Sequence, residues 1–381
     1  MLIEEQRLTG PDGQPARVPA ELLDRSGFDR FAPAFIRALC AVRSRGAAAH
    51  VVDVAGRRLW DTAVARVQGR GPAGGDLSRD DDRPLYWARL QLTRSLRQWT
   101  PRFSLSAQQR ADLIWSLERT SRGQRDITFR HGQKRILISG FDPFTLDSDI
   151  RRSNPSGAAA LYLDGTTVRT PSGPARIETV VFPVLWTPFE QGMVEQTFLP
   201  YLHSIDAFAT VSQGRPDRFD LERWNGRWHT GPDNNRENRA TTIPIPAGVP
   251  TVVPAPEFVP TTLPYEAIVA APTGRFPVRD NTSVTEIPAG GTGPVVQPNG
   301  PTPGSVARAG GGGSYLSNES AYRTTLLRDA VGAAIPGGHI HTPVLQFAPD
   351  NTTEVTDPVL VQNRIDIRAQ VRAILAVIAG S

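Results

Sequence analysis

The sequence predicts an α/β fold in which a largely parallel sheet lies between two layers of helices. Three apolar runs, at residues 135–141, 177–184 and 205–214, are short and typical of buried strands. The segments at 155–163 and 187–202, which separate these runs, have helical spacing of their apolar residues. Strands that alternate with helices indicate an α/β sheet covered on both faces, so we expect a three-layer α/β/α sandwich.

A helical N-terminal extension is expected to precede this sandwich. Apolar residues recur at a helical period over Phe28–Val42 and again over Leu85–Trp99, and Ser106 is a good N-cap for a third helix. We favour the simplest interpretation of these apolar stripes, which is packing within the extension or against the next domain. We therefore expect an extension at 1–130 and an α/β domain at 131–381.

A long irregular segment interrupts the α/β domain. Residues 241–313 contain fourteen prolines and many glycines, which predicts loop with one short helix near 265–271. Such a stretch is usually a functional loop or a disordered insertion. After it, the pattern predicts a helix over 320–333, a strand over 339–347 and an amphipathic terminal helix over 358–379.

Composition narrows the function classes. Hydrophobic residues make up 39% and charged residues 21%, as in ordinary globular proteins, and no apolar run is long enough to cross a membrane. The first residues lack a secretory signal pattern, so we expect a cytoplasmic protein without membrane association. The lone cysteine, Cys40, cannot form an internal disulfide, and we expect it to be a small buried apolar residue.

Basic residues are abundant but are not arranged as a nucleic-acid site. The 42 basic residues include a single lysine, Lys134, and the arginines are interleaved with acidic residues, which leaves a net charge of only +4. A nucleic-acid groove requires basic side chains gathered on one face. We therefore expect no nucleic-acid partner, and no metal or organic cofactor is implied, because metal-binding and phosphate-loop motifs do not occur.

Three local features carry candidate chemistry. Ser317 follows a glycine turn and precedes a helix, where free backbone N–H groups can stabilise an oxyanion. His339 and His341 point to the same face of a strand, and either could act as a base. Glu222 follows closely on a predicted strand, where α/β sites usually lie. Each feature also has a plainer structural interpretation. Ser317 could be a helix cap, the histidines could be packed or hydrogen-bonded residues, and Glu222 could belong to a surface ion pair.

The local sequences resemble the cysteine-type pyroglutamyl peptidases over roughly 134–347. In the family's order stand RILISGFDPF, NPS, QGR, ER, PDN, TLP, SYLSN and GHIHTP, from residue 135 to residue 343. The chain also departs from that pattern: Thr145-Leu146 replaces the family's glycine pair, and Thr230 stands where the family has an arginine before PDN. The insertion at 241–313 is far longer than in compact relatives.

The resemblance implies a phosphorylase/hydrolase-like sandwich and a set of site residues. Ser317 takes the place of the nucleophilic cysteine, His341 that of the base, and Glu222 that of the acid that orients the base. Phe141 and Phe144 would line the pocket for the flat pyroglutamyl ring, and Gln213 would sit at its rim. A Ser-His-Glu triad is chemically competent, since a base can activate a serine hydroxyl.

The implied function is an omega peptidase that hydrolyses the amide after an N-terminal pyroglutamyl or similar cyclic acyl group. Its partner would be a small peptide or amide substrate. The sequence leaves open whether the chain assembles into a homo-oligomer. One alternative is an enzyme that forms or opens a lactam on another small molecule. Others are a non-catalytic binding relative and a cysteine replaced deliberately by serine.

Overall fold

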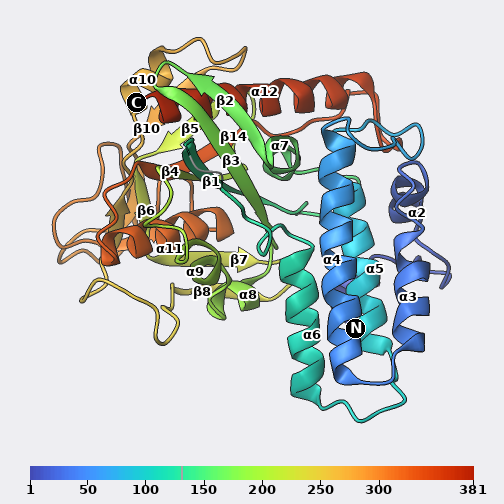
Figure 1. Ribbon diagram of the computed structural model, residues 1–381. Coiled ribbons are helices and arrows are strands. Elements are labelled where there is room, and N and C mark those ends of the chain that lie inside the picture. Colours follow the sequence, from blue (N-terminus) through green and yellow to red (C-terminus); the bar gives the residue numbers. More distant parts are fainter. Residues whose placement is uncertain (130–131) are drawn as a thin grey trace.

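A mixed sheet forms the centre of the α/β part of the molecule. The computed structural model describes residues 1–129 and 132–381, and in this part of the chain the largest sheet has seven strands in the order β10-β5-β14-β4-β1-β3-β2 (Figure 1). The predicted α/β class is confirmed. The domain boundary expected at 130/131 falls on residues outside the described ranges.

Parallel pairing around β1 brings several strand ends to one edge of the sheet. The central strand β1 (Lys134–Phe141) pairs in parallel with β3 (Gly173–Phe182) and β4 (Ala207–Gln213). Strand β14 (Gly337–Thr342) pairs in parallel with β4 and antiparallel with β5 (Phe219–Glu222). The carboxyl ends of β1, β4 and β14 therefore meet at the same edge, where ligand sites of α/β sheets usually lie.

Short strands close the sheet on both sides. Strand β2 (Thr166–Thr170) pairs antiparallel with β3. At the opposite edge, β10 (Val278–Asn281) pairs in parallel with β5. Strand β10 comes from the segment that the sequence predicted to be loop.

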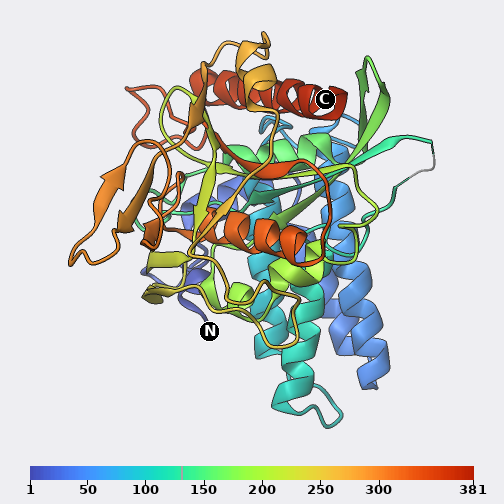
Figure 2. The same ribbon diagram turned by 90° about the vertical axis from the view of Figure 1, so that its left-hand side faces the viewer.

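Helices cover both faces of the sheet (Figures 1 and 2). On one face lie α7 (Pro155–Leu163) and the terminal helix α12 (Pro358–Gly380). On the other lie α8 (Trp186–Glu190), α9 (Met193–Phe198) and α11 (Leu316–Ala330). Each face has its own hydrophobic cluster, so the three-layer prediction is confirmed.

Three element boundaries differ from the predictions. The single helix expected at 187–202 is two helices, because Gly192 between them has a φ of 81°, which ends the helical path. Helix α11 begins at Leu316, four residues before the expected start, and β14 ends at Thr342, because Pro343 cannot continue the ladder.

The N-terminal extension is helical, as predicted. It contains α1 (Ile3–Gln6), α2 (Arg17–Asp24), α3 (Phe31–Ala41), α4 (Arg45–Val67), α5 (Arg83–Gln98) and α6 (Ala107–Thr120). The Ser106 hydroxyl accepts a hydrogen bond from the N–H of Gln109, so the predicted N-cap is confirmed. The long helix α4 was not predicted, because alanine and valine are spread around its circumference and its apolar stripe is weak.

Cys40 is exposed, which contradicts the expectation that it is buried. It lies one position beyond Leu39 in α3, and Leu39 is buried in the core of the extension. Successive helix residues are rotated by about 100°, so the neighbour of a buried residue can face solvent.

The extension is packed against the α/β part through a shared hydrophobic cluster. The cluster contains apolar residues of all the long N-terminal helices, together with Leu146, Ala160, Leu161, Val181 and Val355. In Figure 1 the helices α4, α5 and α6 stand beside the sheet near α7. Apolar surface on both parts is thereby removed from water.

The segment 241–313 is more ordered than predicted. The expected short helix is α10 (Tyr265–Ala270). Strand β9 (Phe258–Pro260) pairs with β6 (Trp224–Gly226), while β8 (Asn238–Thr242), which ends inside the start of the segment, pairs with β7 (Trp228–Pro232). A small antiparallel sheet of β11 (Val284–Ile287), β12 (Val295–Gln297) and β13 (Val306–Ala309) projects from the body (Figure 2).

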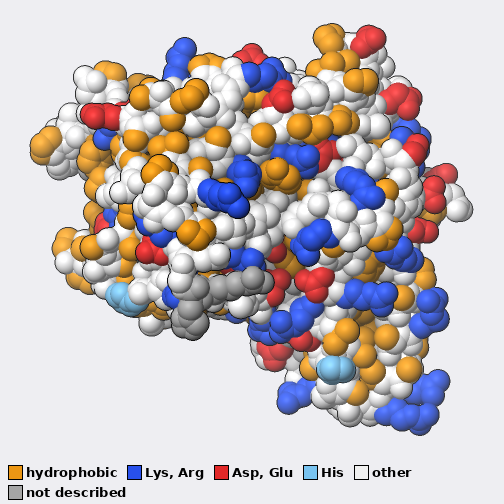
Figure 3. Space-filling model, turned by 45° about the horizontal axis from the view of Figure 1, so that its top comes forward, with side chains coloured by type: hydrophobic (Ala, Val, Ile, Leu, Met, Phe, Trp, Pro, Cys, Tyr) orange, Lys and Arg blue, Asp and Glu red, His pale blue; other side chains and the backbone are white. Residues whose placement is uncertain are grey.

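The surface carries mixed charges. On the face shown in Figure 3, arginine side chains are interspersed with acidic and apolar ones. Among the described residues, no helix is both long enough and apolar enough to span a bilayer.

Residues 126–381 expressed alone should expose the apolar surface that the extension covers. We expect this fragment to aggregate, or to bind a hydrophobic dye far more strongly than the full chain. Size-exclusion chromatography and dye fluorescence measure this. A fragment that is monodisperse and as stable as the full chain would contradict the shared core.

Candidate active site

Ser317 lies at the edge of the sheet where β1, β4 and β14 end. It is the second residue of α11, and the N-cap residue Tyr315 makes no side-chain cap hydrogen bond. The first N–H groups of a helix have no partner within the helix. The start of α11 therefore offers free donors, and a partial positive charge, close to the Ser317 hydroxyl.

The start of α11 is anchored by Asn318. Its side-chain amide donates to the carbonyls of Gly226 and Trp228, and its oxygen accepts from the N–H of Gly226. The carbonyl of Ser314 also accepts from the N–H of Thr230. Ser317 thus stands on a helix end that two neighbouring strands hold in place.

His341 and Glu222 form a buried pair beside this helix start. The Nδ1 atom of His341 is 2.8 Å from Oε1 of Glu222, and the two residues are 4% and 2% exposed. A neutral imidazole that donates from Nδ1 to a carboxylate keeps Nε2 as an acceptor. This is the arrangement of a general base oriented by an acid.

The second candidate base, His339, has different neighbours. Its two ring nitrogens bond to the hydroxyls of Thr210 (2.7 Å) and Ser212 (2.8 Å), and its Nε2 lies 3.4 Å from Nε2 of His341. Burial, together with the proximity of His341, lowers the pKa of His339 well below its usual value. His339 therefore stays neutral at physiological pH and is better suited to supporting His341 than to accepting a proton.

A glycine loop covers the His341–Glu222 pair. A Cβ atom at Gly312 would lie 2.2 Å from Cε1 of His341, and one at Gly311 would lie 2.3 Å from Oε2 of Glu222. Neither distance is sterically allowed, so any side chain at these positions would displace the pair. The glycines before Ser317 are required by this close approach.

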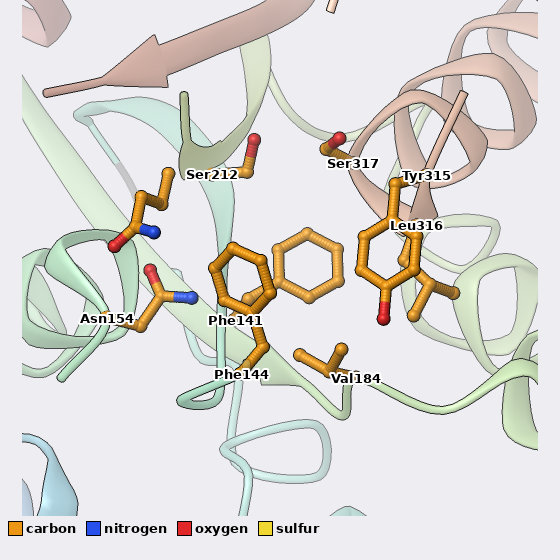
Figure 4. Close-up of a pocket in the computed structure, with 9 residues that line it drawn as sticks. Phe141, Phe144, Asn154, Val184, Ser212, Tyr315, Leu316 and Ser317 are labelled. Carbon is orange, nitrogen blue, oxygen red and sulfur yellow. The ribbon is translucent and has the colours of Figure 1, made fainter. Parts of the chain in front are cut away.

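Ser317 lines a small pocket of about 280 Å³. The other lining residues come from β1, β4 and the loops that follow the strands: Phe141, Phe144, Asn154, Val184, Ser212, Gln213, Tyr315 and Leu316. Figure 4 shows the aromatic rings around the pocket, with the hydroxyls of Ser212 and Ser317 on one side. The three residues that the resemblance placed at the pocket, Phe141, Phe144 and Gln213, all line it.

The two phenylalanines have unequal roles. Phe141 is buried and packs on Phe182 and Phe189, so it forms the floor. Phe144 is only partly buried, and its ring centroid lies 6.2 Å from that of Tyr315. These two rings present apolar faces to whatever occupies the pocket.

The predicted contact between Ser317 and His341 is absent. Within residues 1–129 and 132–381, no hydrogen bond joins the Ser317 hydroxyl to either nitrogen of His341, whereas Glu222 occupies Nδ1 as expected. The structure thus joins two of the three expected triad residues directly and places the third at the adjoining pocket.

Sequence reasoning missed a second buried histidine–acid pair. His229 Nδ1 lies 2.6 Å from Oε2 of Glu319 on α11, and Arg323 bonds to both Glu319 and Glu195. Burial opposes the charge on Glu319, but Arg323 and His229 outweigh it and lower the pKa of that carboxyl. The side chains of this network are buried, and they join α11 to β7 and α9.

Arginines of the extension bond to the loop that follows β1. Asp142, between the two pocket phenylalanines, bonds to Arg89 of α5 and to Arg122. All three side chains are buried, so the charges neutralise one another away from water. The position of the pocket wall therefore depends on residues of the extension.

The pocket residue Asn154 is held from the same side. Its N–H donates to Asp82 of the extension at 2.9 Å, and its side-chain amide donates to the carbonyl of Asp142 at 2.8 Å. The Asp82 carboxylate also accepts from Ser153. Burial and the neighbouring Asp81 raise the pKa of Asp82 to about 6.

Glu4 extends this support to a third loop. Its carboxyl accepts from the hydroxyl of Tyr86 at 2.8 Å and from the side chain of Asn234 at 3.2 Å, and Asn234 also donates to the carbonyl of Pro143. Burial, then the charge of Asp142, raises the pKa of Glu4 to about 7.

Thr145 has a strained backbone in the loop that carries Phe144. Its φ is 58°, in the left-handed region that favours glycine. A non-glycine residue in this region costs roughly 1–2 kcal/mol.

Metal coordination has no obvious place in this site. In the described part of the chain, no three histidine, cysteine, aspartate or glutamate side chains are grouped as metal ligands.

Comparisons with known proteins identify the family. The family "PA0049 N-terminal domain" matches residues 1–118, and the family "PA0049, C-terminal domain" matches 135–268 and 273–346. Protein PA0049 of Pseudomonas aeruginosa is 35% identical over 459 residues, which cover 92% of this chain and 82% of that protein. The chain belongs to the PA0049 family.

Solved structures with a related arrangement were also found for this PA0049-family chain. Pyroglutamyl peptidase I of Bacillus amyloliquefaciens is 21% identical, with a TM-score of 0.42, over 65% of this chain and 98% of that one. A mutant pyrrolidone carboxyl peptidase of Pyrococcus furiosus is 20% identical, with a TM-score of 0.42, over 64% and 97%.

The raised pKa of Glu4 predicts a pH-dependent stability. A carboxyl whose pKa rises from 4.5 to about 7 on folding stabilises the fold below pH 4.5, and this contribution is lost as the pH rises through 7. Glu4→Gln keeps the acceptor oxygen without the charge. We expect it to raise the unfolding free energy at pH 8 by roughly 1–3 kcal/mol and to change it little at pH 4.5. Denaturant unfolding at both pH values, with exposed Glu354→Gln as the control, checks this; an equal effect at both would contradict it.

Proposed function

We propose that the chain is a hydrolase that cleaves the amide bond after an N-terminal pyroglutamyl or similar cyclic acyl group. The observation that carries the proposal is the buried His341–Glu222 pair, which is connected through His339 to Ser212 in the wall of the small aromatic pocket that Ser317 also lines. Ser317 is the nucleophile, His341 the general base, and Glu222 the acid that orients His341.

The pocket is suited to a small flat ring that carries polar groups. The faces of Phe144 and Tyr315 can contact a ring on its apolar surface. The side-chain amide of Gln213 offers a donor and an acceptor for a lactam carbonyl and N–H. The pocket is small, with about 280 Å³ of empty space that includes its solvent-open mouth, so it favours a small acyl group.

The mechanism follows from the placement of these groups. Ser317 Oγ attacks the acyl carbonyl while its proton passes to Nε2 of His341, and the oxyanion is stabilised by N–H groups at the start of α11. His341 then gives this proton to the leaving amine. Water, deprotonated by His341, attacks the acyl-serine, and His341 returns the proton to Ser317 Oγ as the acyl group leaves as an acid. The first step requires Ser317 Oγ to come within hydrogen-bond reach of Nε2 once substrate is bound.

A second candidate function is binding without turnover. The observation that favours it is the missing hydrogen bond between Ser317 and His341. A serine-directed fluorophosphonate probe separates the two candidates. Labelling at Ser317, abolished by Ser317→Ala and slowed by His341→Ala, supports the hydrolase. A wild-type chain that binds pyroglutamyl amides but never labels is a binding protein.

Ser317→Ala should reduce hydrolysis of pyroglutamyl amides by about 10³-fold or more, because the hydroxyl that attacks the acyl carbonyl is removed. Ser317→Cys tests the origin of the serine. If the site descends from a cysteine enzyme and has decayed, the cysteine variant should gain activity. If serine is the evolved nucleophile, the variant should be no better. Assays over a panel of pyroglutamyl and other N-acyl amides measure both, and wild-type activity that survives in Ser317→Ala would contradict the assignment.

Phe144→Ala should weaken binding of pyroglutamyl compounds by about 1–3 kcal/mol, through lost apolar contact with the ring. Calorimetric titration measures the affinity. Phe103→Ala, which removes a partly buried phenylalanine of the extension, is the control and should leave the affinity unchanged. An unchanged affinity for Phe144→Ala would show that the ring, or the substrate class, is misassigned.

A further inference from the structure

The second carboxylate oxygen of Glu222 has its own partner. While Oε1 bonds to His341, Oε2 accepts a hydrogen bond from the side-chain amide of Asn281 at 2.7 Å. Glu222 is 2% exposed, so Oε2 has little access to water. Without Asn281 this oxygen would lose a donor in a place where water cannot fully replace it.

Asn281 is fixed in position by its strand. It is the last residue of β10 and lies directly beside Glu222 in the parallel pairing of β10 with β5. Its carbonyl accepts from the N–H of Arg223, the residue that follows Glu222. Backbone and side chain therefore both tie Asn281 to the end of β5.

The orientation of its amide is fixed as well. The oxygen of Asn281 accepts from the hydroxyl of Ser283 at 2.8 Å, so the nitrogen must face the other way. That nitrogen donates to Glu222 and also to the carbonyl of Gly311 at 2.9 Å. One amide thus joins the acid to the glycine loop that covers the imidazole of His341.

This contact gives the Pro/Gly-rich segment 241–313 a role in the site. Strand β10 is the part of that segment that enters the central sheet, and Asn281 is its last residue. We propose that Asn281 is a positioning residue, which holds the Glu222 carboxylate and the Gly311–Gly312 loop at the distance that keeps His341 oriented as a base. The proposal rests on the hydrolase function assigned above.

The residue type fits this role. An aspartate would put a second negative charge against Glu222, and an apolar residue of the same size would leave Oε2 without its donor. The side-chain amide of asparagine is a neutral donor that reaches two acceptors, Glu222 and the carbonyl of Gly311. Its oxygen accepts the hydrogen bond from Ser283.

Asn281→Leu is the direct test, because it keeps the volume and removes the donor. We expect labelling of Ser317 by a fluorophosphonate to slow by roughly ten- to a hundredfold, the factor of a lost charge-assisted hydrogen bond. For hydrolysis, kcat should fall by the same factor while KM stays the same. Thr282→Val is the matched control: it removes the adjacent bond from Thr282 to the carbonyl of Pro298 and should leave both rates unchanged.

A proton NMR measurement makes the test independent of turnover. The His341 Nδ1–H bonded to Glu222 should give a low-field resonance, assigned by its loss in Glu222→Gln and His341→Ala. We expect it to vanish or broaden in Asn281→Leu and to persist in Thr282→Val. A wild-type resonance in a folded Asn281→Leu protein overturns the proposal. If wild type neither labels nor hydrolyses, the hydrolase function fails and the resonance alone decides the role of Asn281.

Ser283→Ala covers the case in which Asn281→Leu does not fold. It removes the hydroxyl that donates to the Asn281 oxygen and leaves only the longer bond, at 3.3 Å, from the N–H of Ser283. We expect it to slow labelling by roughly two- to tenfold and to broaden the same resonance. A Ser283→Ala protein with wild-type labelling and an unchanged resonance would overturn the proposal.

Discussion

The carboxylate of Asp142 lies between Arg89 and Arg122, and all three charges are removed from water. A buried charge is tolerated only while its partners stay in place, because loss of one partner leaves the others uncompensated. Asp142 belongs to the loop that carries Phe141 and Phe144, whereas Arg89 and Arg122 come from the N-terminal part of the chain. The wall of the pocket is thus set by contacts that the α/β part cannot make by itself.

The same principle recurs where the extension meets the rest of the sheet. Arg364 of the terminal helix lies against Asp80 and Asp81, and Arg83 bonds to Asp81 within the same run. Burial opposes the charge on Asp81, yet Arg364 and Arg83 keep its pKa below the usual value. Ion pairs of this kind add little net stability over apolar packing. They select one docking geometry, because a shift of the extension would leave several buried charges without partners.

Sequence patterns predicted the strands and helices whose signals are local. The apolar runs of β1, β3 and β4, the proline start of α7 and the Ser106 cap required no knowledge of distant residues. The run SRDDDRP could not be interpreted in this way: it has the composition of an exposed loop, and its partner Arg364 lies 284 residues beyond Asp80. Strand β10 was missed for a related reason, since it is short, lies at an edge and carries charged residues that face outward.

The residues of the candidate site also divide into those that local sequence predicts and those that depend on distant neighbours. Alternation along β14 indicated that His339 and His341 share a face, but only their neighbours distinguish them. Thr210 and Ser212 surround the first, and Glu222 meets the second. The contribution of Asn281 was beyond prediction, because it depends on the register between two strands that are separated by a long irregular segment.

The distance in sequence between these buried partners has a consequence for how the protein is made. Helices α2 to α6 are synthesised before the α/β part and can form from local contacts. At that stage Asp82 and Arg89 lack their partners Asn154 and Asp142, and Asp80 lacks Arg364. The extension can therefore reach its docked geometry only after α12 has been translated. Until then its docking face stays charged and hydrated.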